Sequence, residues 1–334
     1  MMEEGPPRCR VEGPEEQETF RETGSSGAVA VAEQDRDVRI RMAAFEWLAD
    51  AVRRHGDVLP RSLLEGGFEV DGTGVPLVGP QGIFKPRVLE FPLSITTTPR
   101  SPYDDAFGDD GLLRYRYRGT DPGHPDNAGL RQCMVRRLPL VYFHGIVPGK
   151  YVPAWPAYVV DDDPKQLRFT VAVDDARHAK VEEGHTWLPQ DAAEAGRRAY
   201  VTATVRVRLH QRAFRERVLQ AYRRQCAFCR LRYEELLDAA HIVPDADPRG
   251  EPRVQNGLAL CSLHHAAFDR MFLGVRPDYV IEVRRDVLDM PDGPTLEHAI
   301  QGLHRARLVL PTSPDLWPDR HLLEVRYEEF RRAV

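Results

Sequence analysis

The chain has 334 residues, of which 42% are hydrophobic, with a formal net charge of −5 and a mean hydropathy of −0.46. At roughly 100–200 residues per domain, this length favours two domains. No apolar run reaches the roughly 18 residues that cross a bilayer, and the N-terminus lacks the basic and apolar segments of a secretory signal. These features argue against a membrane-spanning chain and predict a cytoplasmic protein.

The first 34 residues differ in composition from the rest of the chain. Residues 1–34 are rich in Glu, Gly, Pro and Ser and poor in large apolar side chains, which is typical of a disordered tail. Order is expected to begin near Asp35. From Val38 to Val52, apolar residues recur at three- and four-residue steps, which predicts an amphipathic helix that ends at His55.

Short β-prone runs separated by Gly, Pro and Asp fill the stretch 60–205. They lie at residues 68–70, 87–91, 112–118, 139–143 and 167–173. With the preceding helix, they predict an α+β domain of mostly antiparallel strands over residues 35–205. Seven aromatic residues near its turns can line a pocket, although each alone is more typical of a core: Tyr115, Tyr117, Tyr142, Phe143, Tyr151, Trp155 and Tyr158.

A helical spacing of apolar residues returns near Leu209 and ends at the first cysteine pair. Its apolar members are Phe214, Val218, Leu219 and Tyr222. Between Arg197 and Arg232 the chain carries eleven arginines and one acid, Glu216, which gives this stretch a charge of about +10. Such a stretch can be a phosphate-binding stripe or a solvated helix face, and charge alone leaves both interpretations open.

The cysteines point to a metal site. Five are present, an odd number: Cys9, Cys133, Cys226, Cys229 and Cys261. In a reducing compartment, clustered cysteines are more typical of metal binding than of disulfides. Cys226 and Cys229 form one pair, and Cys261 and His264 form another after 31 intervening residues. A two-residue gap lets one turn supply two of the four ligands that zinc prefers, so we predict a structural zinc site. The alternative is buried cysteines beside an unrelated histidine.

A second metal site is predicted beside the zinc ligands. His265 and Asp269 are four residues apart, so on a helix they share one face and can hold a divalent ion. His264 points about a quarter-turn away, so the start of one helix can serve both sites. The alternative is a helix N-terminus in which Asp269 forms an ordinary ion pair.

His241 is the candidate general base. It lies in the short apolar run 239–244, which is consistent with a strand. A histidine near its ordinary pKa can take a proton from water at neutral pH, although a lone histidine in such a run is more often a core residue. Asn256, just before Gly257, can tie down the intervening loop and help to orient His241, whereas Asn-Gly alone indicates only a turn.

Together these residues resemble the HNH endonuclease family, in particular its bacterial subgroup of predicted restriction endonucleases with a ββα-metal, treble-clef nuclease domain. The three letters of the family name fall on His241, Asn256 and His265. The resemblance covers about a quarter of the chain, and it rests on Asp238–Pro244 and Asn256–Phe272 together with the cysteine pairs. It implies a general base on a strand and metal ligands on the helix that follows.

The resemblance implies a metal-dependent DNA endonuclease. His241, Asn256 and His265 would be catalytic, with Mg²⁺ or Mn²⁺ on His265 and Asp269 and a structural Zn²⁺ on the cysteine pairs. Arginines of the lead-in helix would grip DNA phosphates: Arg212, Arg215, Arg223 and Arg224. Residues 35–205 would recognise DNA, in plain or modified form, in a restriction or defence role. Cleavage of both strands would favour a homodimer.

One position departs from the family pattern. Many members carry Asp or His immediately before the catalytic histidine as a further metal ligand, whereas this chain has Ala240. Asp238 is the nearest carboxylate, but on an ideal strand it faces away from His241 because the two are three residues apart. A bulge, a water molecule, or another acid such as Asp245 or Asp247 is then needed to complete the site.

The sequence therefore divides into a tail at 1–34, a recognition domain at 35–205, a nuclease domain at 206–285 and an extension at 286–334. The extension contains a proline-rich connection at 311–318 and a closing helix at 319–332. The alternative function is a zinc-containing DNA-binding protein without cleavage activity, which would need the zinc ligands but neither His241 nor Asp269.

Overall fold

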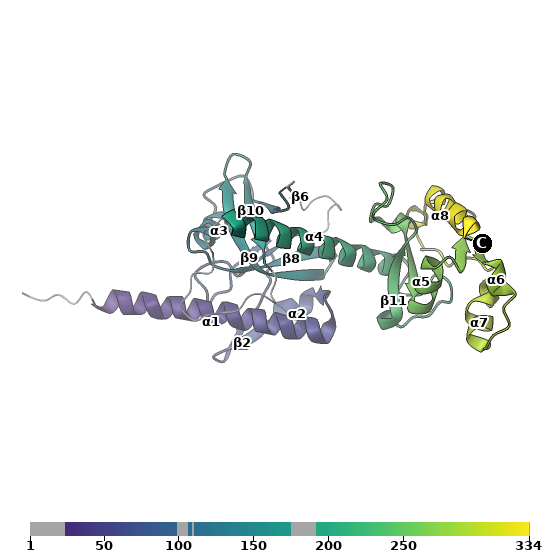
Figure 1. Ribbon diagram of the computed structural model, residues 1–334. Coiled ribbons are helices and arrows are strands. Elements are labelled where there is room, and N and C mark those ends of the chain that lie inside the picture. The colour runs from purple at the N-terminus through teal and green to yellow at the C-terminus, as the bar shows by residue number, and fades with distance from the viewer. Residues whose placement is uncertain (1–23, 99–105, 109, 175–191, 334) are drawn as a thin grey trace, which may run out of the picture.

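A computed structural model describes residues 24–98, 106–108, 110–174 and 192–333. It contains both helices and strands, so the predicted mixed α+β class is confirmed. The chain forms a large sheet region near its N-terminus and a smaller α+β region near its C-terminus, and one long helix runs between them (Figure 1). None of the described helices is long and apolar enough to cross a membrane.

Within the described residues, the N-terminal region is built on an eight-stranded sheet. Its main path, in spatial order, is β4 (Ile83–Phe84), β5 (Ser94–Thr96), β8 (Leu140–Val147), β9 (Lys150–Asp163), β10 (Arg168–Val173), β7 (Leu113–Arg116) and β6 (Ala106–Phe107). The short strand β1 (Leu59–Pro60) also pairs with β9. Neighbours are antiparallel except for β5 and β8, which are parallel, so the prediction of mostly antiparallel strands is confirmed.

Both faces of the sheet are covered by helices. Successive side chains of a strand point to opposite faces, so one strand contributes to two cores. On β8, Val141 and Phe143 belong to a core with α1 (Gly24–His55) and α2 (Arg61–Gly66), whereas Tyr142 belongs to the core of the other face. That second core includes α3 (Pro125–Val135) and the middle of α4 (Ala192–Ala221). A small hairpin, β2 (Phe68–Val70) and β3 (Thr73–Val75), lies beside α1.

Three predicted elements differ from the structure. Residues 87–91 form turns and bends instead of a strand, because Pro86 and Pro92 bracket the segment and lack the N–H that a ladder needs. Helix α1 begins at Gly24, ahead of the predicted start near Asp35, since the alanine-rich run after it favours helix. Residues 1–23 of the predicted tail lie outside the described residues. Helix α4 also begins earlier than predicted, at Ala192.

Helix α4 belongs to two cores. Leu209 and Ala213 pack in the core of the sheet, and one turn later Phe214 and Val218 pack in the core of the C-terminal region. Glu216 lies at this change-over, between Phe214 and Val218, and is 2% exposed. Its Oε1 accepts a hydrogen bond of 2.7 Å from Lys150 of β9 and another from Arg224. The helix therefore joins the two regions without an intervening loop (Figure 1).

The C-terminal region places a hairpin between two helices. Its strands are β11 (Leu237–His241) and β12 (Gly257–Cys261), and α4 packs on them from one side while α5 (Ser262–Asp269) follows directly from β12. Two short 3₁₀ turns precede the strands, at Glu234–Leu236 and Val254–Asn256. Gly257 is required where α4 meets β12, because a Cβ there would lie 2.5 Å from Val218 Cγ2.

The remaining elements extend the same core. They are β13 (Leu273–Val275), β14 (Ile281–Val283), α6 (Arg285–Leu288), α7 (Pro294–Ala299), two 3₁₀ turns at Gln301–Leu303 and Pro314–Leu316, and α8 (Arg320–Arg332). Helix α8 is the predicted closing helix, and the Asp319 carboxylate caps it by accepting from the N–H of His321 at 2.9 Å. Leu322 and Leu323 bury its inner face against the core of the C-terminal region.

Candidate active site and metal centre

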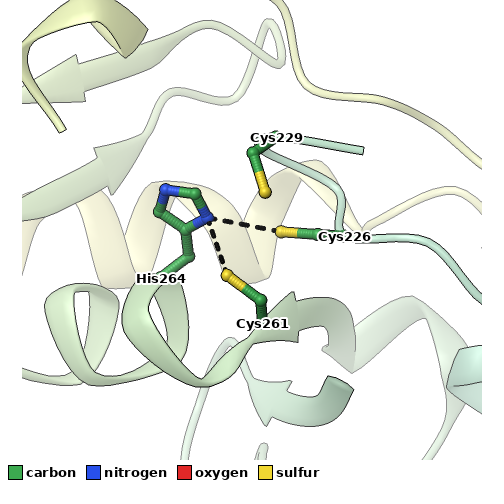
Figure 2. A group of neighbouring side chains, drawn as sticks. All are labelled: Cys226, Cys229, Cys261 and His264. Atoms are coloured by element: carbon green, nitrogen blue, oxygen red, sulfur yellow. Dashed lines mark hydrogen bonds between the residues drawn. The ribbon is translucent and has the colours of Figure 1, made fainter. Parts of the chain in front are cut away.

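The two predicted zinc pairs come together in the structure. Cys226 and Cys229 lie in the turn after α4, Cys261 ends β12, and His264 lies in the first turn of α5. One donor atom from each residue lies within 4.8 Å of the others, and the side chains point toward a common centre (Figure 2). Among the described residues this is the only group of three or more such donors that converges in this way.

The hydrogen bonds of His264 direct its Nδ1 toward the cysteine sulfurs, where it could bind a metal. Its Nε2 donates to the carbonyl of Ala299 at 2.7 Å, so the proton is held on the far side of the ring. Its Nδ1 lies 3.4 Å from Cys226 Sγ and 3.2 Å from Cys261 Sγ (Figure 2). Three sulfurs and one imidazole nitrogen match the donor set of a structural zinc site, and the cluster could hold a metal.

The closely packed thiols of the cluster have pKa values that are shifted in opposite directions. Hydrogen bonds with Cys226 and Cys229 hold the pKa of the Cys261 thiol well below its usual range. Hydrogen bonds with Cys226 and Cys261 raise the pKa of Cys229 well above its usual range. Burial opposes the charged form of His264, but its hydrogen bonds to Cys226 and Cys261 raise its pKa to about 10. The cluster therefore retains protons that a cation would displace.

His265 is the neighbour of the buried His264 but points outward, with 24% of its side chain exposed. Its Nε2 lies 3.4 Å from Asp269 Oδ2, so the predicted sharing of a helix face is confirmed. Its Nδ1 lies 3.7 Å from Asp238 Oδ2 on β11. The two carboxylates thus flank the imidazole from opposite sides, and each is more than half exposed.

Asp238 lies beside His265, a contact that the sequence did not predict. Ala240, the position that is acidic or histidine in many relatives, is fully buried and supplies no donor. The carboxylate of Asp238 instead reaches His265 from the exposed side of β11, because α5 packs against this strand. The alternation of the strand indicated only that Asp238 points away from His241, and it gave no information on α5. Asp247 is engaged by Arg249 at 2.8 Å.

His241 lies at the end of β11 with its ring held by packing. Its imidazole stacks on Phe214 of α4, with ring centroids 4.0 Å apart and planes inclined by 14°. The helical spacing of the sequence placed Phe214 on an apolar face but did not indicate this contact. His241 Nε2 is buried and has no hydrogen-bond partner among the described residues, which calls for a bound water or ligand. Burial lowers the pKa of His241, so the ring is neutral at pH 7.

Asn256 closes the loop that follows His241. It is fully buried, its Oδ1 accepts from the Val243 N–H at 2.9 Å, and its Nδ2 donates to the Val243 carbonyl at 2.9 Å. Nδ2 also donates to the Glu251 carbonyl at 3.2 Å. The backbone carbonyl of Asn256 accepts from the Ile242 N–H at 2.9 Å. The predicted role of its amide in tying down this loop is therefore confirmed.

Three of the four arginines predicted to bind phosphate already have partners. Arg212 pairs with Asp57 at 2.5 Å, and Arg224 pairs with Glu216 and Glu234. Arg215 donates to the Leu237 carbonyl at 2.7 Å and lies 3.3 Å from Asp238. Arg223 is exposed. In the protein alone, three of these four candidate arginines thus already pair with groups of the chain.

Comparison with known proteins identifies the class. Residues 226–276 match the model of a family described as HNH endonuclease. This range contains the whole metal cluster, His241, Asn256, His265 and Asp269. The chain therefore contains an HNH endonuclease domain, and it is a nuclease that hydrolyses nucleic acid. None of the curated proteins compared with the chain matches it.

Among solved structures, one described as "Modification dependent TagI restriction endonuclease" aligns with 72% of this chain and 81% of its own. The aligned residues are 15% identical and the TM-score is 0.26.

Proposed function

We propose that the protein is a metal-dependent DNA endonuclease in which His241 acts as general base. One observation carries the proposal: a neutral, half-buried histidine with an unpartnered ring nitrogen lies at the end of β11, beside the His265–Asp269 pair. A base near neutral protonation and without a protein partner is suited to accept a proton from water.

The zinc assignment rests on donor chemistry. Zinc prefers four thiolate or imidazole ligands, and the Cys₃His group supplies four that converge. Such a closed set leaves no open position for a substrate, so its role would be structural. The site joins the end of α4, the end of β12 and the start of α5, and zinc would therefore fix the helix that carries His265 and Asp269.

The residues around His265 fit Mg²⁺ or Mn²⁺. One imidazole nitrogen with one or two carboxylates is a donor set for such ions, which keep several waters and bind substrate phosphate. His265 and Asp269 would hold the ion on the Nε2 side of the ring, and Asp238, on the opposite Nδ1 side, would orient the imidazole. When bound, such an ion stabilises the negative charge that builds up on the phosphate and the leaving oxygen.

The residues of the chain account for the proton transfer. His241 accepts a proton from a water molecule whose oxygen forms a bond to the scissile phosphorus. The bond from phosphorus to the 3′ oxygen breaks, and this oxygen leaves with the bonding electrons and takes a proton from solvent to become a hydroxyl. Stacking on Phe214 holds the imidazole plane at the centroid distance of 4.0 Å. Asn256 supports the backbone just after His241 through its contacts with Val243. Positioning of this kind is needed because general-base catalysis depends on geometry before pKa.

Recognition of DNA is proposed for residues 35–205, with plain or modified DNA as the ligand. The sheet has cores of its own, separate from that of the nuclease region. Six of the seven aromatic residues that the sequence offered for a base pocket are 7% exposed or less, so most of their surface belongs to these cores. Affinity for duplexes that differ only in cytosine methylation or hydroxymethylation tests the modified-base proposal, which equal affinities would contradict.

The decisive experiment for cleavage uses a supercoiled plasmid. The purified chain is incubated with Mg²⁺, with Mn²⁺ or with a chelator, alongside the His241→Ala variant. We expect nicked or linear product only with the ion and the intact histidine. Full cleavage by His241→Ala would refute the assignment of the base. A restriction or defence role is a further proposal, tested by phage challenge of cells that express the wild type or His241→Ala.

A further inference from the structure

One arginine of α4 differs from its neighbours in the charge around it. Arg212, Arg215 and Arg224 each lie within ion-pair distance of a carboxylate. Arg217 forms no ion pair among the described residues, and its one hydrogen bond runs from Nη2 to the Pro252 carbonyl at 3.2 Å. Its Nε is buried and has no hydrogen-bond partner there.

An arginine in this state is costly for the protein alone. A guanidinium has five N–H donors and stays protonated at any physiological pH. Arg217 is half-buried, and desolvation lowers its pKa, with no carboxylate to offset the effect. Burial of a charge without an opposite charge is unfavourable, and an anion bound to Arg217 would offset this cost.

The position of Arg217 places it at the nuclease site. It lies three residues after Phe214, whose ring stacks on His241, so the two share a face of α4. Val218, the next residue, packs where β12 begins at Gly257, which is paired with His241 across the hairpin. Pro252, the partner of Arg217, belongs to the loop that Asn256 closes. The side chain of Arg217 therefore extends from α4 to the loop that follows the candidate base.

We propose that Arg217 binds a phosphate of the DNA strand that enters the site beside His241. This inference rests on the proposed DNA endonuclease function. Phosphate is the anion that such a strand presents, and a guanidinium fork binds it through paired, charge-assisted hydrogen bonds. The Nη donors that Pro252 does not use supply those bonds, while Nε stays buried behind them.

The test measures DNA affinity without cleavage. The full chain carrying His241→Ala binds a labelled duplex over a range of roughly 50 to 200 mM salt, with and without Arg217→Gln. We expect Arg217→Gln to weaken binding about tenfold, as for loss of a charge-assisted hydrogen bond. The slope of log affinity against log salt should fall by about 0.9, as expected for one phosphate contact. Arg217→Lys should keep the slope and lose only part of the affinity.

A matched control separates a specific contact from a general loss of charge. Arg285 on α6 is exposed, with 84% of its side chain accessible, and Arg285→Gln removes the same charge elsewhere in the region. We expect this variant to bind DNA as its parent does. If Arg285→Gln weakened binding as much as Arg217→Gln, the proposal would be overturned.

Two further results bear on the proposal. A lower melting temperature of Arg217→Gln with an unchanged salt slope would mean that Arg217 only tethers the Pro252 loop, which overturns the inference and leaves the nuclease function intact. Absence of DNA binding by the His241→Ala parent, together with absence of DNA cleavage by the wild type, would instead refute the proposed function and this inference with it.

Discussion

Two neighbouring histidines on α5 lie in opposite kinds of surroundings, one buried and one partly exposed. His264 is 1% exposed, and each of its ring nitrogens has a partner in the Cys₃His cluster or at Ala299. His265 is 24% exposed and lies between two carboxylates that are more than half exposed. A site that stabilises a fold uses all its donors internally, whereas a site for chemistry must leave positions for water and substrate. A helical rotation of about 100° separates the two cases.

Removal of a ligand from the proposed zinc site should have the largest effect on this contrast. We expect Cys261→Ser to release the metal and unfold the nuclease region, since metal binding worth roughly 10–16 kcal/mol counts as folding free energy in small zinc domains. Zinc content by atomic absorption and the melting temperature measure the effect. Cys133→Ala is the matched control, because this buried cysteine lies on α3 away from the cluster, and it should retain the zinc. Full zinc content in Cys261→Ser would contradict the assignment.

His241→Ala tests the open site alone. Removal of a general base should slow cleavage by about 10²- to 10⁴-fold while the fold and DNA affinity remain. Plasmid nicking rates with Mg²⁺ measure the change, and circular dichroism checks the fold. His298→Ala, an exposed histidine on α7, should cleave as the wild type does. Equal losses in both variants would argue against a specific role for His241.

Carboxylate substitutions sharpen the contrast further. We expect Asp269→Asn to raise the Mg²⁺ concentration for half-maximal cleavage by about 10- to 100-fold, and Asp238→Asn to have a smaller effect at its longer distance of 3.7 Å. Neither variant should change zinc content. Asp278→Asn, exposed and paired with Arg276, serves as control. If Asp238→Asn matched Asp278→Asn, the carboxylate on β11 would have no part in orienting His265.

The pH dependence of cleavage gives the smallest effect. Burial lowers the pKa of His241 below its ordinary 6.5, and the charge of Asp245 offsets this only in part. The base acts in its neutral form, so kcat/KM should stay level from pH 8 down through about 6.5 and fall only at lower pH. Rates measured across this range at saturating Mg²⁺ test the direction. A decline that begins above pH 6.5 would contradict it.

Much of the nuclease region could be predicted because its chemistry is local in sequence. The spacing of Cys226 and Cys229, and of His265 and Asp269, sets which side chains share a turn or a helix face. The burial of Ala240 and the contact of Asp238 with His265 could not be predicted, because they depend on how α5 docks on β11. Pairing of the arginines with Asp57, Glu216 and Glu234 likewise depends on contacts between distant segments.

The sheet region was predicted less well in detail. The β-prone runs identified β7, β8 and β10, but the run at 87–91 forms no strand. Its Leu89 and Phe91 are buried by a turn that lies on the core, and burial rather than pairing produces the pattern there. Boundaries of α1 and α4 were missed where helix propensity, without an apolar face, sets the start.

Helix α4 sets the distance between the sheet and the C-terminal region. Its 30 residues span about 45 Å without interruption, and Lys150 of the sheet bonds to Glu216 where the contacts of α4 pass to the C-terminal core. If the sheet holds the target, the distance and the rotational phase from the recognised position to the scissile phosphate are set by residue count. One added residue in this helix would turn the nuclease by about 100°, whereas seven would nearly restore its phase and shift the cut along the DNA.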